Sequence, residues 1–416
     1  MNVIIAGGGI VGLSTAYYLS KAGHDVTVID TGDISNGCSF GNMGYISPSH
    51  FIPIATPGIV AQGLRWMMSS SSPFYIKPRM NMDLMRWGMA FRRQANPTTL
   101  NKNIPHLNAL LQLSRRLMDE MGEKFPGQFN MTANGCWMMY KNEKTGDHEK
   151  QLAEQAEKLG LKTILCNSQQ VQEYETQTEV DVLGGVLYLD DCHIDSSRLM
   201  RVLYSHLLAS KVKFWINTRV TGFETRNERI TRVITDRMAL TCDEFVLANG
   251  SWMGETAKEL GIRILMQPGK GYSLDYHDNE RNLQYPSILV DHRTATTPIG
   301  RRLRIGGTME LSGHSNNILP KRVMAIYNAF KLYYPKMNLP LPDPAKAWYG
   351  YRPVSPDGMP YIGRHRKFAN LSFAGGHAML GVSAAAATGL LIKEVIGGER
   401  PTISLEAFDP GRFTRT

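Results

Sequence analysis

The chain has 416 residues, 43% hydrophobic and 20% charged, which are the proportions of a globular protein with about two domains. Its formal net charge of +9 favours anionic partners such as a diphosphate cofactor, a carboxylate substrate or an acidic membrane surface. No basic run is interleaved with base-stacking aromatic residues, so nucleic acid is not an expected partner.

The five cysteines are scattered and show no C-x-x-C spacing. Neither a metal site nor a disulfide scaffold is therefore expected, and a reducing cytoplasm is the natural setting. The first residues lack a basic leader and a cleavage site, so we do not expect a signal peptide. The most apolar stretch, residues 378–392, is rich in alanine and predicts a buried helix rather than a membrane span.

The first thirty residues predict a strand, a glycine turn, a helix and a second strand that ends at Asp30. The turn fits G-x-G-x-x-G with Gly7, Gly9 and Gly12. Glycines at this spacing allow a pyrophosphate to approach the backbone at a helix N-terminus, and the acid binds a ribose. This stretch therefore predicts a dinucleotide site without saying which dinucleotide.

The next part of the chain predicts a loop and a segment of unusual composition. Residues 35–50 are polar and glycine-rich, which suits a loop laid against a cofactor, although an ordinary surface loop has the same composition. Within residues 51–100, segments 58–68 and 82–93 combine Met and Trp with arginine. That mixture suits interfacial helices. The alternative is core-facing helices whose methionines fill gaps.

The middle of the chain predicts alternating helices and strands. Amphipathic patterns predict helices at residues 105–124, 148–159, 194–208 and 321–334. Apolar runs predict strands at residues 135–141, 184–189, 264–276, 287–290 and 303–306. Another strand ends in Ala248-Asn249-Gly250, and GKGYSL near residue 270 lacks the spacing of a phosphate loop.

The final segment, like the first thirty residues, is rich in recognisable motifs. Residues 348–364 predict a turn-rich connection around an arginine, and a strand then leads through Gly375-Gly376-His377 into a helix of small residues. The opening turn, the strand at Ala248 and this late turn are three separated nucleotide-type pieces. A nucleotide domain interleaved with another domain favours FAD over a nicotinamide cofactor.

Five motifs in order resemble the D-amino acid oxidase-like family of FAD-dependent oxidoreductases, and within it the D-amino acid dehydrogenase branch. They are GNMGYISPSHFIPIATPG, PGKGYSL, RLRIGGTMEL, GYRPVSPDGMPYIGR and GGHAMLG. The resemblance implies an α/β fold in which a Rossmann-like FAD-binding domain is interleaved with a mixed-sheet α+β substrate domain. The implied FAD-binding segments are 1–50, 190–255 and 345–416, and the implied substrate segments are 51–189 and 256–344.

The resemblance also implies the residues that hold FAD. Those expected to line its site are Gly7, Gly9, Ile10, Val11, Gly12, Asp30, Thr31, Ser39, Asn42, Met43, Gly44, Tyr45, Val220, Ala248, Gly250, Gly376, His377, Leu380 and Gly381. Two departures stand out. Cys38 replaces a threonine of the family loop, and no arginine follows Gly376-His377, in agreement with the dehydrogenase branch.

Three residues are candidates for the chemistry. The guanidinium of Arg352 matches a substrate carboxylate with two hydrogen bonds, whereas the alternative is an interdomain salt bridge. Tyr272 could bond the carboxylate or cover the pocket, or it could be an ordinary strand tyrosine. His50 lies in a flavin-side motif and could serve catalysis, loop structure or packing.

The function implied is oxidative deamination of D-amino acids by hydride transfer from Cα to flavin N5, giving an imino acid and then a 2-oxo acid and ammonia. A quinone-type acceptor would take the electrons, with peripheral membrane contact through residues 51–100 of a cytoplasmic protein. The alternatives are a dehydrogenase specific for cis-4-hydroxy-D-proline or D-proline, an oxidase that uses O2, a flavin-binding sensor without catalysis, and a nicotinamide enzyme.

Overall fold

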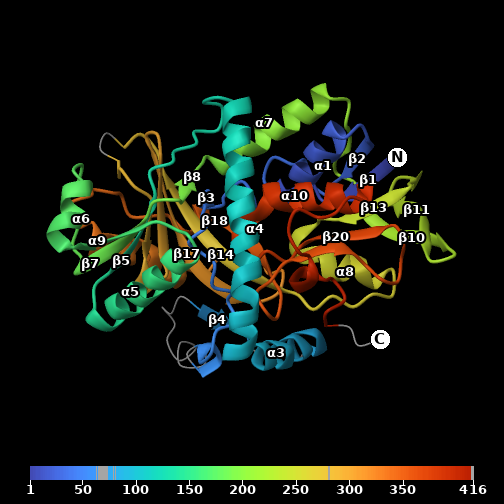
Figure 1. Ribbon diagram of the computed structural model, residues 1–416. Helices are drawn as coiled ribbons and strands as arrows, with labels where there is room; N and C mark the ends of the chain where they lie inside the picture. The colour runs from blue at the N-terminus through green and yellow to red at the C-terminus, as the bar shows by residue number, and fades with distance from the viewer. Residues whose placement is uncertain (62, 64–73, 78, 80, 280–281, 414–416) are drawn as a thin grey trace.

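The computed structural model describes residues 1–416 except 62, 64–73, 78, 80, 280–281 and 414–416. Figure 1 shows two halves, each built around a sheet, with the long helix α4 crossing in front of the junction between them. The α-helices among the described residues are α1 (Ile10–Lys21), α3 (Met82–Gln94), α4 (Pro97–Lys124), α5 (Glu143–Lys158), α6 (Ser168–Tyr174), α7 (Ser196–Ala209), α8 (Met253–Lys258), α9 (Pro320–Tyr333) and α10 (Gly381–Gly397).

The right half of Figure 1 holds a six-stranded sheet in the order β19-β20-β13-β1-β2-β9. All neighbours are parallel except β19 and β20. Its strands are β1 (Asn2–Ala6), β2 (Asp25–Ile29), β9 (Lys213–Trp215), β13 (Glu244–Leu247), β19 (Tyr361–Arg364) and β20 (Leu371–Gly375). The three separated nucleotide-type pieces of the sequence therefore meet on adjacent strands, which confirms the predicted interleaved fold.

The left half holds a larger mixed sheet in the order β18-β14-β17-β16-β15-β5-β7-β6, with β4 paired to β17. Its strands are β4 (Phe74–Ile76), β5 (Cys136–Tyr140), β6 (Thr163–Asn167), β7 (Gly184–Tyr188), β14 (Gln267–Tyr276), β15 (Ser287–Leu289), β16 (Thr294–Ile299), β17 (Arg302–Leu311) and β18 (Trp348–Val354). Two small sheets complete the fold, formed by β10 (Val220–Arg226), β11 (Arg229–Thr235) and β12 (Ala239–Thr241), and by β3 (Tyr45–Ile46) with β8 (Cys192–His193).

Small residues in α10 allow it to pack closely against α1. A Cβ on Gly389 would overlap the backbone of Ser14 on α1, so the two helices approach to backbone contact. Leucines of α4 share the same core as the alanines of α10. Among the described residues, one helix is apolar and long enough to span a membrane, namely α10 together with the turn that precedes it (Ala378–Gly397). Within its most apolar stretch, 67% of the residues are buried inside the protein. The sequence predicted such a buried helix.

Some elements differ from the predicted ones, because a capping side chain sets where a helix begins or because strand pairing makes a stretch extended. Helix α4 begins at Pro97 because Asn96 caps it, eight residues before the predicted start, and it continues through Pro105. Helix α5 begins at Glu143 because Asn142 caps it. The prediction of turns at residues 348–354 was wrong, since this stretch is strand β18, paired with β14 in the larger sheet.

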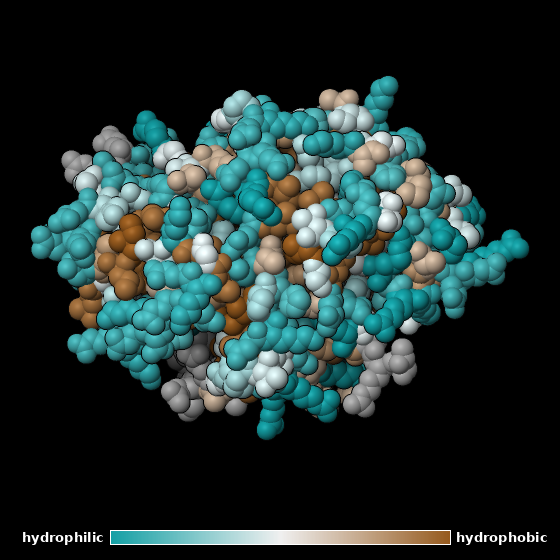
Figure 2. Space-filling view, viewed as in Figure 1, coloured by the Kyte–Doolittle hydropathy of each residue, from teal (hydrophilic) through white to brown (hydrophobic). Residues whose placement is uncertain are grey.

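The face shown in Figure 2 is mostly hydrophilic, with hydrophobic patches on the left half and beside α4. The predicted helix at 82–93 is α3, whereas most of the segment 58–68 lies outside the described residues. The predicted domain boundaries remain a prediction; β18 lies in the larger sheet although those boundaries group it with the FAD-binding segments.

Candidate active site

Two glycines of the opening turn, Gly7 and Gly12, leave no room for a side chain. Gly7 has φ +113°, a conformation that L side chains avoid, and a Cβ there would overlap the backbone of Ala248 and Asn249. A Cβ on Gly12 would overlap the carbonyl of Gly7. The turn therefore presses helix α1 against β1 and β13 and leaves bare backbone facing the cavity beyond.

This backbone fits the pyrophosphate of the FAD that the resemblance implies. Among the described residues, none accepts a hydrogen bond from the backbone N–H of Gly9, Val11 or Gly12, whereas the N–H of Ile10 donates to the hydroxyl of Ser39 (3.0 Å). Unpaired N–H groups at a helix N-terminus bind anions. Asp30 lies beside them, and its carboxylate accepts from the N–H of Gly8 (2.6 Å) and of Gly32 (2.7 Å). These bonds orient the acid towards the cavity for a ribose.

The loop after β2 is fixed by side chains from the larger sheet. Arg304 donates from Nη1 to the carbonyls of Phe40 (3.0 Å) and Asn42 (2.6 Å), and Thr297 donates from its hydroxyl to the carbonyl of Met43 (2.7 Å). Asp275 in turn holds Arg304 through two bonds of 2.7 Å. The loop therefore takes its shape from residues more than 230 positions away, and it joins the two halves of the protein at the cavity.

The glycine turn, the loop and the larger sheet enclose one cavity of about 2210 Å³, large enough for a dinucleotide and a small substrate. Most of the predicted cofactor residues line it, namely Gly7, Gly9, Ile10, Val11, Asp30, Thr31, Ser39, Asn42, Met43, Tyr45, Val220, Ala248, Gly250, His377, Leu380 and Gly381. Gly12, Gly44 and Gly376 do not line it. Gly44 and Gly376 have positive φ (+77° and +78°) and shape the backbone beneath the cavity.

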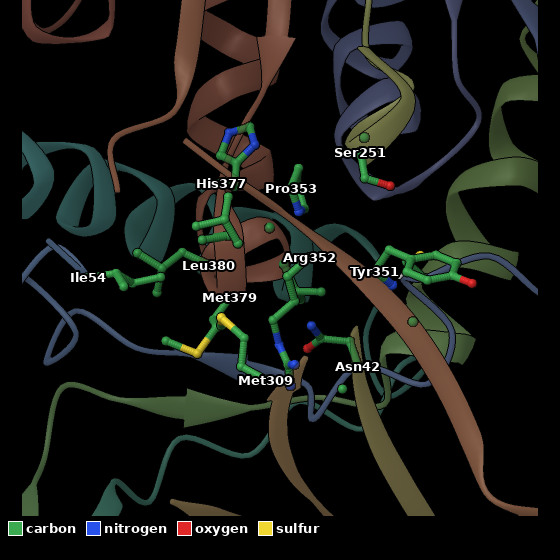
Figure 3. Close-up of a pocket in the computed structure, with 18 of the residues that line it drawn as sticks. Asn42, Ile54, Ser251, Met309, Tyr351, Arg352, Pro353, His377, Met379 and Leu380 are labelled. Carbon is green, nitrogen blue, oxygen red and sulfur yellow. Dashed lines mark hydrogen bonds between the residues drawn. The ribbon is translucent and has the colours of Figure 1, made fainter. Parts of the chain in front are cut away.

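Arg352 lies at the centre of the cavity on a floor of glycines, and Figure 3 shows it between Met309 and Asn42. Its strand β18 is the edge of the larger sheet, and a Cβ on Gly271 of the neighbouring β14 would overlap the guanidinium. The side chain crosses β14 and donates from Nη1 to the carbonyl of Thr308 on β17 (2.8 Å). Burial lowers the pKa of Arg352 to about 10, so it is cationic at neutral pH.

Thr308 is a strained residue beside Arg352. Its φ of +64° is rare for a β-branched residue, and it lies where the pairing of β17 with β14 shifts register. Its hydroxyl is buried and has no hydrogen-bond partner in the described part of the chain. Strain and an unpaired hydroxyl at a cavity indicate a ligand site. The remaining guanidinium donors of Arg352 and the Thr308 hydroxyl together suit a carboxylate.

Tyr272 is not brought to the same place as Arg352. Side chains alternate along a strand, and Gly269 and Gly271 of β14 lie under Arg352, so Tyr272 belongs to the opposite face. There it is 2% exposed and donates from its hydroxyl to Glu310 Oε2 (2.6 Å). The structure therefore gives its hydroxyl a partner within the protein, although the residue also lines the cavity.

The two histidines of the flavin-side motifs are neutral at physiological pH. Burial, reinforced for His50 by the charge of Arg293, lowers the pKa of His50 to about 4, and burial lowers that of His377 to about 3. His50 borders the cavity, with Nδ1 3.0 Å from the hydroxyl of Ser49. Nε2 of His377 lies 2.8 Å from the hydroxyl of Thr388 in α10. The ring therefore makes a hydrogen bond within the protein that ties the turn before α10 to the helix.

Sequence reasoning missed three polar residues of the cavity wall, Thr308, Glu149 and Arg293. Thr308 lies within a quoted motif, RLRIGGTMEL, but nothing in the motif marks its positive φ. Glu149 falls among many charged residues of α5, and Arg293 falls in a turn. No local pattern distinguishes these two residues from solvated ones, because strand pairing and helix packing bring them to the cavity.

Comparison with known proteins gives consistent results. A family model described as FAD dependent oxidoreductase matches residues 2–395. The chain is 30% identical to a D-amino acid dehydrogenase from Granulibacter bethesdensis, covering 97% of both chains. It is 28% identical to another from Bradyrhizobium diazoefficiens, covering 99% of both.

Solved structures share the fold. Glycine oxidase from Geobacillus kaustophilus matches with a TM-score of 0.79 and 18% identity, covering 99% of both chains. L-proline dehydrogenase from P. horikoshii matches with a TM-score of 0.76 and 21% identity, covering 99% of this chain and 97% of that one. Because the sequence identities are this low, the two structures support the fold of this chain and nothing beyond it.

Proposed function

Because the chain belongs to the family of FAD dependent oxidoreductases, we propose that it is a dehydrogenase that oxidises D-amino acids. The observation that carries the proposal is Arg352, a cation on a glycine floor inside the cavity that borders the nucleotide turn. A planar guanidinium with free donors is suited to the α-carboxylate of an amino acid. The relatives named D-amino acid dehydrogenase support the stereochemistry of the substrate.

The residues of this chain act by binding, orienting and excluding water. FAD, when bound, supplies the two-electron acceptor that amino acids need for oxidation. The N-termini of α1 and α10 would hold its polar groups, and Arg352 with Thr308 would fix the substrate carboxylate. Fixing the carboxylate orients the Cα–H bond, which reduces the entropic part of the barrier.

The proton balance requires no strong base in the protein. The reacting amine is the neutral form, which releases its Cα hydrogen with two electrons and leaves an imino acid. Water then converts an acyclic imino acid into a 2-oxo acid and ammonia. His50, which is neutral above pH about 4, borders the cavity without adding a positive charge that would oppose formation of the iminium product.

The test is an anaerobic panel of D-, L- and cyclic amino acids with the FAD-loaded protein, in which reduction of the yellow flavin is followed by absorbance. We expect D-amino acids to bleach the flavin and L-enantiomers to leave it oxidised. Arg352→Ala should raise KM by about a hundredfold while FAD stays bound, since a charge-assisted bidentate contact is lost. Unchanged KM in this variant would contradict the assignment.

We also propose that α3 docks the protein on a membrane that holds a quinone acceptor. Its outer face carries a stripe of exposed methionines, Met82, Met85 and Met89 (60%, 56% and 56% exposed), beside Arg92 and Arg93. An apolar stripe flanked by arginines suits an anionic membrane surface.

The inner face of α3 meets the active-site cavity. Trp87 of α3 lines the cavity and donates from Nε1 to the carbonyl of Val354 (2.9 Å), two residues from Arg352. One short helix therefore separates the proposed membrane contact from the substrate site. This arrangement supports a quinone acceptor in the lipid and a place for the protein at the cytoplasmic face of the membrane.

Replacing the three methionines by glutamine tests the surface. We expect the variant to lose binding to vesicles of anionic lipid and to reduce vesicle quinone more slowly, while reduction of a soluble dye is unchanged. Leu165→Gln and Leu189→Gln, which change exposed leucines elsewhere (50% and 40% exposed), serve as controls. Equal vesicle binding by all the variants would refute the proposal.

A further inference from the structure

Glu149 is a buried acid without a partner. It lies on α5, is 6% exposed and lines the active-site cavity. Within the described part of the chain its carboxylate accepts no hydrogen bond and forms no ion pair. An unpaired buried carboxylate is costly, and proteins keep one where a ligand meets it. Burial raises the pKa of Glu149 to about 7, and the charge of Arg293 opposes this rise.

Helix α5 covers the same face of the larger sheet on which Arg352 lies. Ala153 and Ala156 of α5 pack in one cluster with Met138 and Val186 of the sheet and with Phe51 of the loop that borders the cavity. Trp137 and Met139, which alternate with Met138, belong to the core on the opposite face. The carboxylate of Glu149 thus enters the cavity from the wall that faces the substrate site.

Arg293 also lines the cavity, and the next residue, Thr294, pairs with Gly307 of β17. Arg293 precedes β16 and is exposed at the cavity wall, and its guanidinium makes no hydrogen bond or ion pair with other described residues. Its carbonyl is 3.0 Å from the position of a Cβ on Gly307, the residue before Thr308. Arg352 reaches Thr308 from the other side of β17. The backbone of Arg293 and the guanidinium of Arg352 therefore lie beside neighbouring residues of β17, Gly307 and Thr308, on its two sides.

We propose that Glu149 and Arg293 form a second substrate subsite that binds a hydroxyl group on the amino acid side chain. This inference rests on the proposed function, because Arg352 must hold the carboxylate for the side chain to extend towards this wall. A hydroxyl donates one hydrogen bond and accepts two, so it can donate to the carboxylate of Glu149 and accept from the guanidinium of Arg293.

The charges of the subsite select a neutral group. Arg293 would repel an ammonium group brought to Glu149, and Glu149 would repel a second carboxylate brought to Arg293. The other acid of this wall, Asp291, is already occupied, since it accepts from the N–H of Lys141 (2.7 Å) and the hydroxyls of Thr145 (2.5 Å) and Tyr333 (2.8 Å). Glu149 and Arg293 thus offer the ligand one hydrogen-bond acceptor group and one donor group.

The test compares each hydroxylated substrate with its counterpart that lacks the hydroxyl. The pairs are cis-4-hydroxy-D-proline with D-proline and D-threonine with D-2-aminobutyrate, and the measured quantity is the ratio of kcat/KM within each pair. We expect the wild-type ratio to favour the hydroxylated member of at least one pair. Glu149→Ala should lower that ratio by about tenfold or more, because a site built for a hydroxyl loses its acceptor.

Two further variants keep the result interpretable. Glu149→Gln preserves shape and should lower the ratio less than Glu149→Ala, and Glu154→Gln, an exposed change on the same helix, should leave it unchanged. The FAD content and thermal midpoint of every variant are measured beside the ratio, so that a loss of folding is recognised separately from a loss of the subsite.

The possible failures are distinguishable. If no D-amino acid reduces the flavin, the proposed function is wrong. If D-amino acids reduce it but the ratio is the same in wild type and Glu149→Ala, only the subsite is wrong. A wild-type preference for members without the hydroxyl would also overturn the subsite.

Discussion

The two ends of the cavity present different groups to a ligand, backbone at one end and side chains at the other. At the nucleotide end the ligand meets backbone, in the form of a glycine turn and the N-termini of α1 and α10, and Asp30 is the main charged side chain. At the substrate end it meets side chains that stand on a sheet, above all Arg352, Thr308, Arg293 and Glu149. A backbone site holds one invariant cofactor, whereas a side-chain site can be altered without disturbing the fold.

The difference also appears in how each end uses glycine. Gly7 and Gly12 are needed because a Cβ would collide with backbone, which cannot move. Gly271 is needed because a Cβ would collide with the guanidinium of Arg352, which can move. Replacing a glycine by alanine should therefore abolish cofactor binding at the nucleotide end. At the substrate end the same replacement should only displace the side chain of Arg352, which binds the substrate.

The largest effect is expected for Gly12→Ala. The new methyl would overlap the carbonyl of Gly7, force α1 away from the turn and remove the N–H groups that hold the pyrophosphate. We expect the purified protein to retain less than about a tenth of its FAD, measured by absorbance after denaturation. Gly88→Ala, in helix α3 with nothing within 4 Å of the new methyl, is the control. Normal FAD content in Gly12→Ala would remove the distinction between the ends.

A smaller and different effect is expected for Gly271→Ala. Its methyl displaces the guanidinium of Arg352 from its bond to Thr308 but touches no part of the nucleotide turn. KM for the amino acid should rise by about tenfold or more with FAD content unchanged. The matched control is Gly222→Ala in strand β10, where the nearest atom lies 4.0 Å from the new methyl. Loss of FAD in Gly271→Ala would show that the two ends are not independent.

This contrast explains how much the sequence could predict. The nucleotide end depends on residues close in sequence, since Gly7, Gly9 and Gly12 lie within six positions, so spacing alone indicated its position and shape. The interleaved sheet followed from three such local pieces. Arg352 was predicted through family resemblance, and the structure supplies the glycine floor and the Thr308 carbonyl that orient it.

The rest of the substrate end depends on strand register and helix packing. Tyr272 is close to Gly271 in sequence, but strand alternation turns it to the opposite face, where Glu310 takes its hydroxyl. Glu149 and Arg293 are 144 positions apart and reach the same cavity only because α5 packs on the strands beside β16. Composition and periodicity carry no information about such pairs, so no local pattern could have identified them.

A last consequence of the comparison concerns stability and pH. Three buried acids whose pKa values burial raises to about 7, Glu149, Glu175 and Asp191, lie in or beside the larger sheet. Asp191 is fully buried and holds the loop before His50, accepting from the N–H of Ser49 (3.0 Å) and from its hydroxyl (2.6 Å). Its ordinary pKa is 3.8, so between pH about 4 and 7 the folded protein retains a proton that the unfolded chain has released.

Stability from this group is therefore present at low pH and is lost as pH rises towards 7, by at most about 4 kcal/mol. Asp191→Asn cannot ionise and still offers an oxygen to the Ser49 N–H, so its stability should fall less over this range. We expect the thermal midpoint of the FAD-loaded wild type, followed by flavin fluorescence, to drop more between pH about 5 and 8 than that of Asp191→Asn. Asp147→Asn, an exposed change on α5, should follow the wild type. Parallel curves for wild type and Asp191→Asn would mean that Asp191 is ionised in the folded protein throughout, and that the substrate end tolerates a buried charge at no cost to stability.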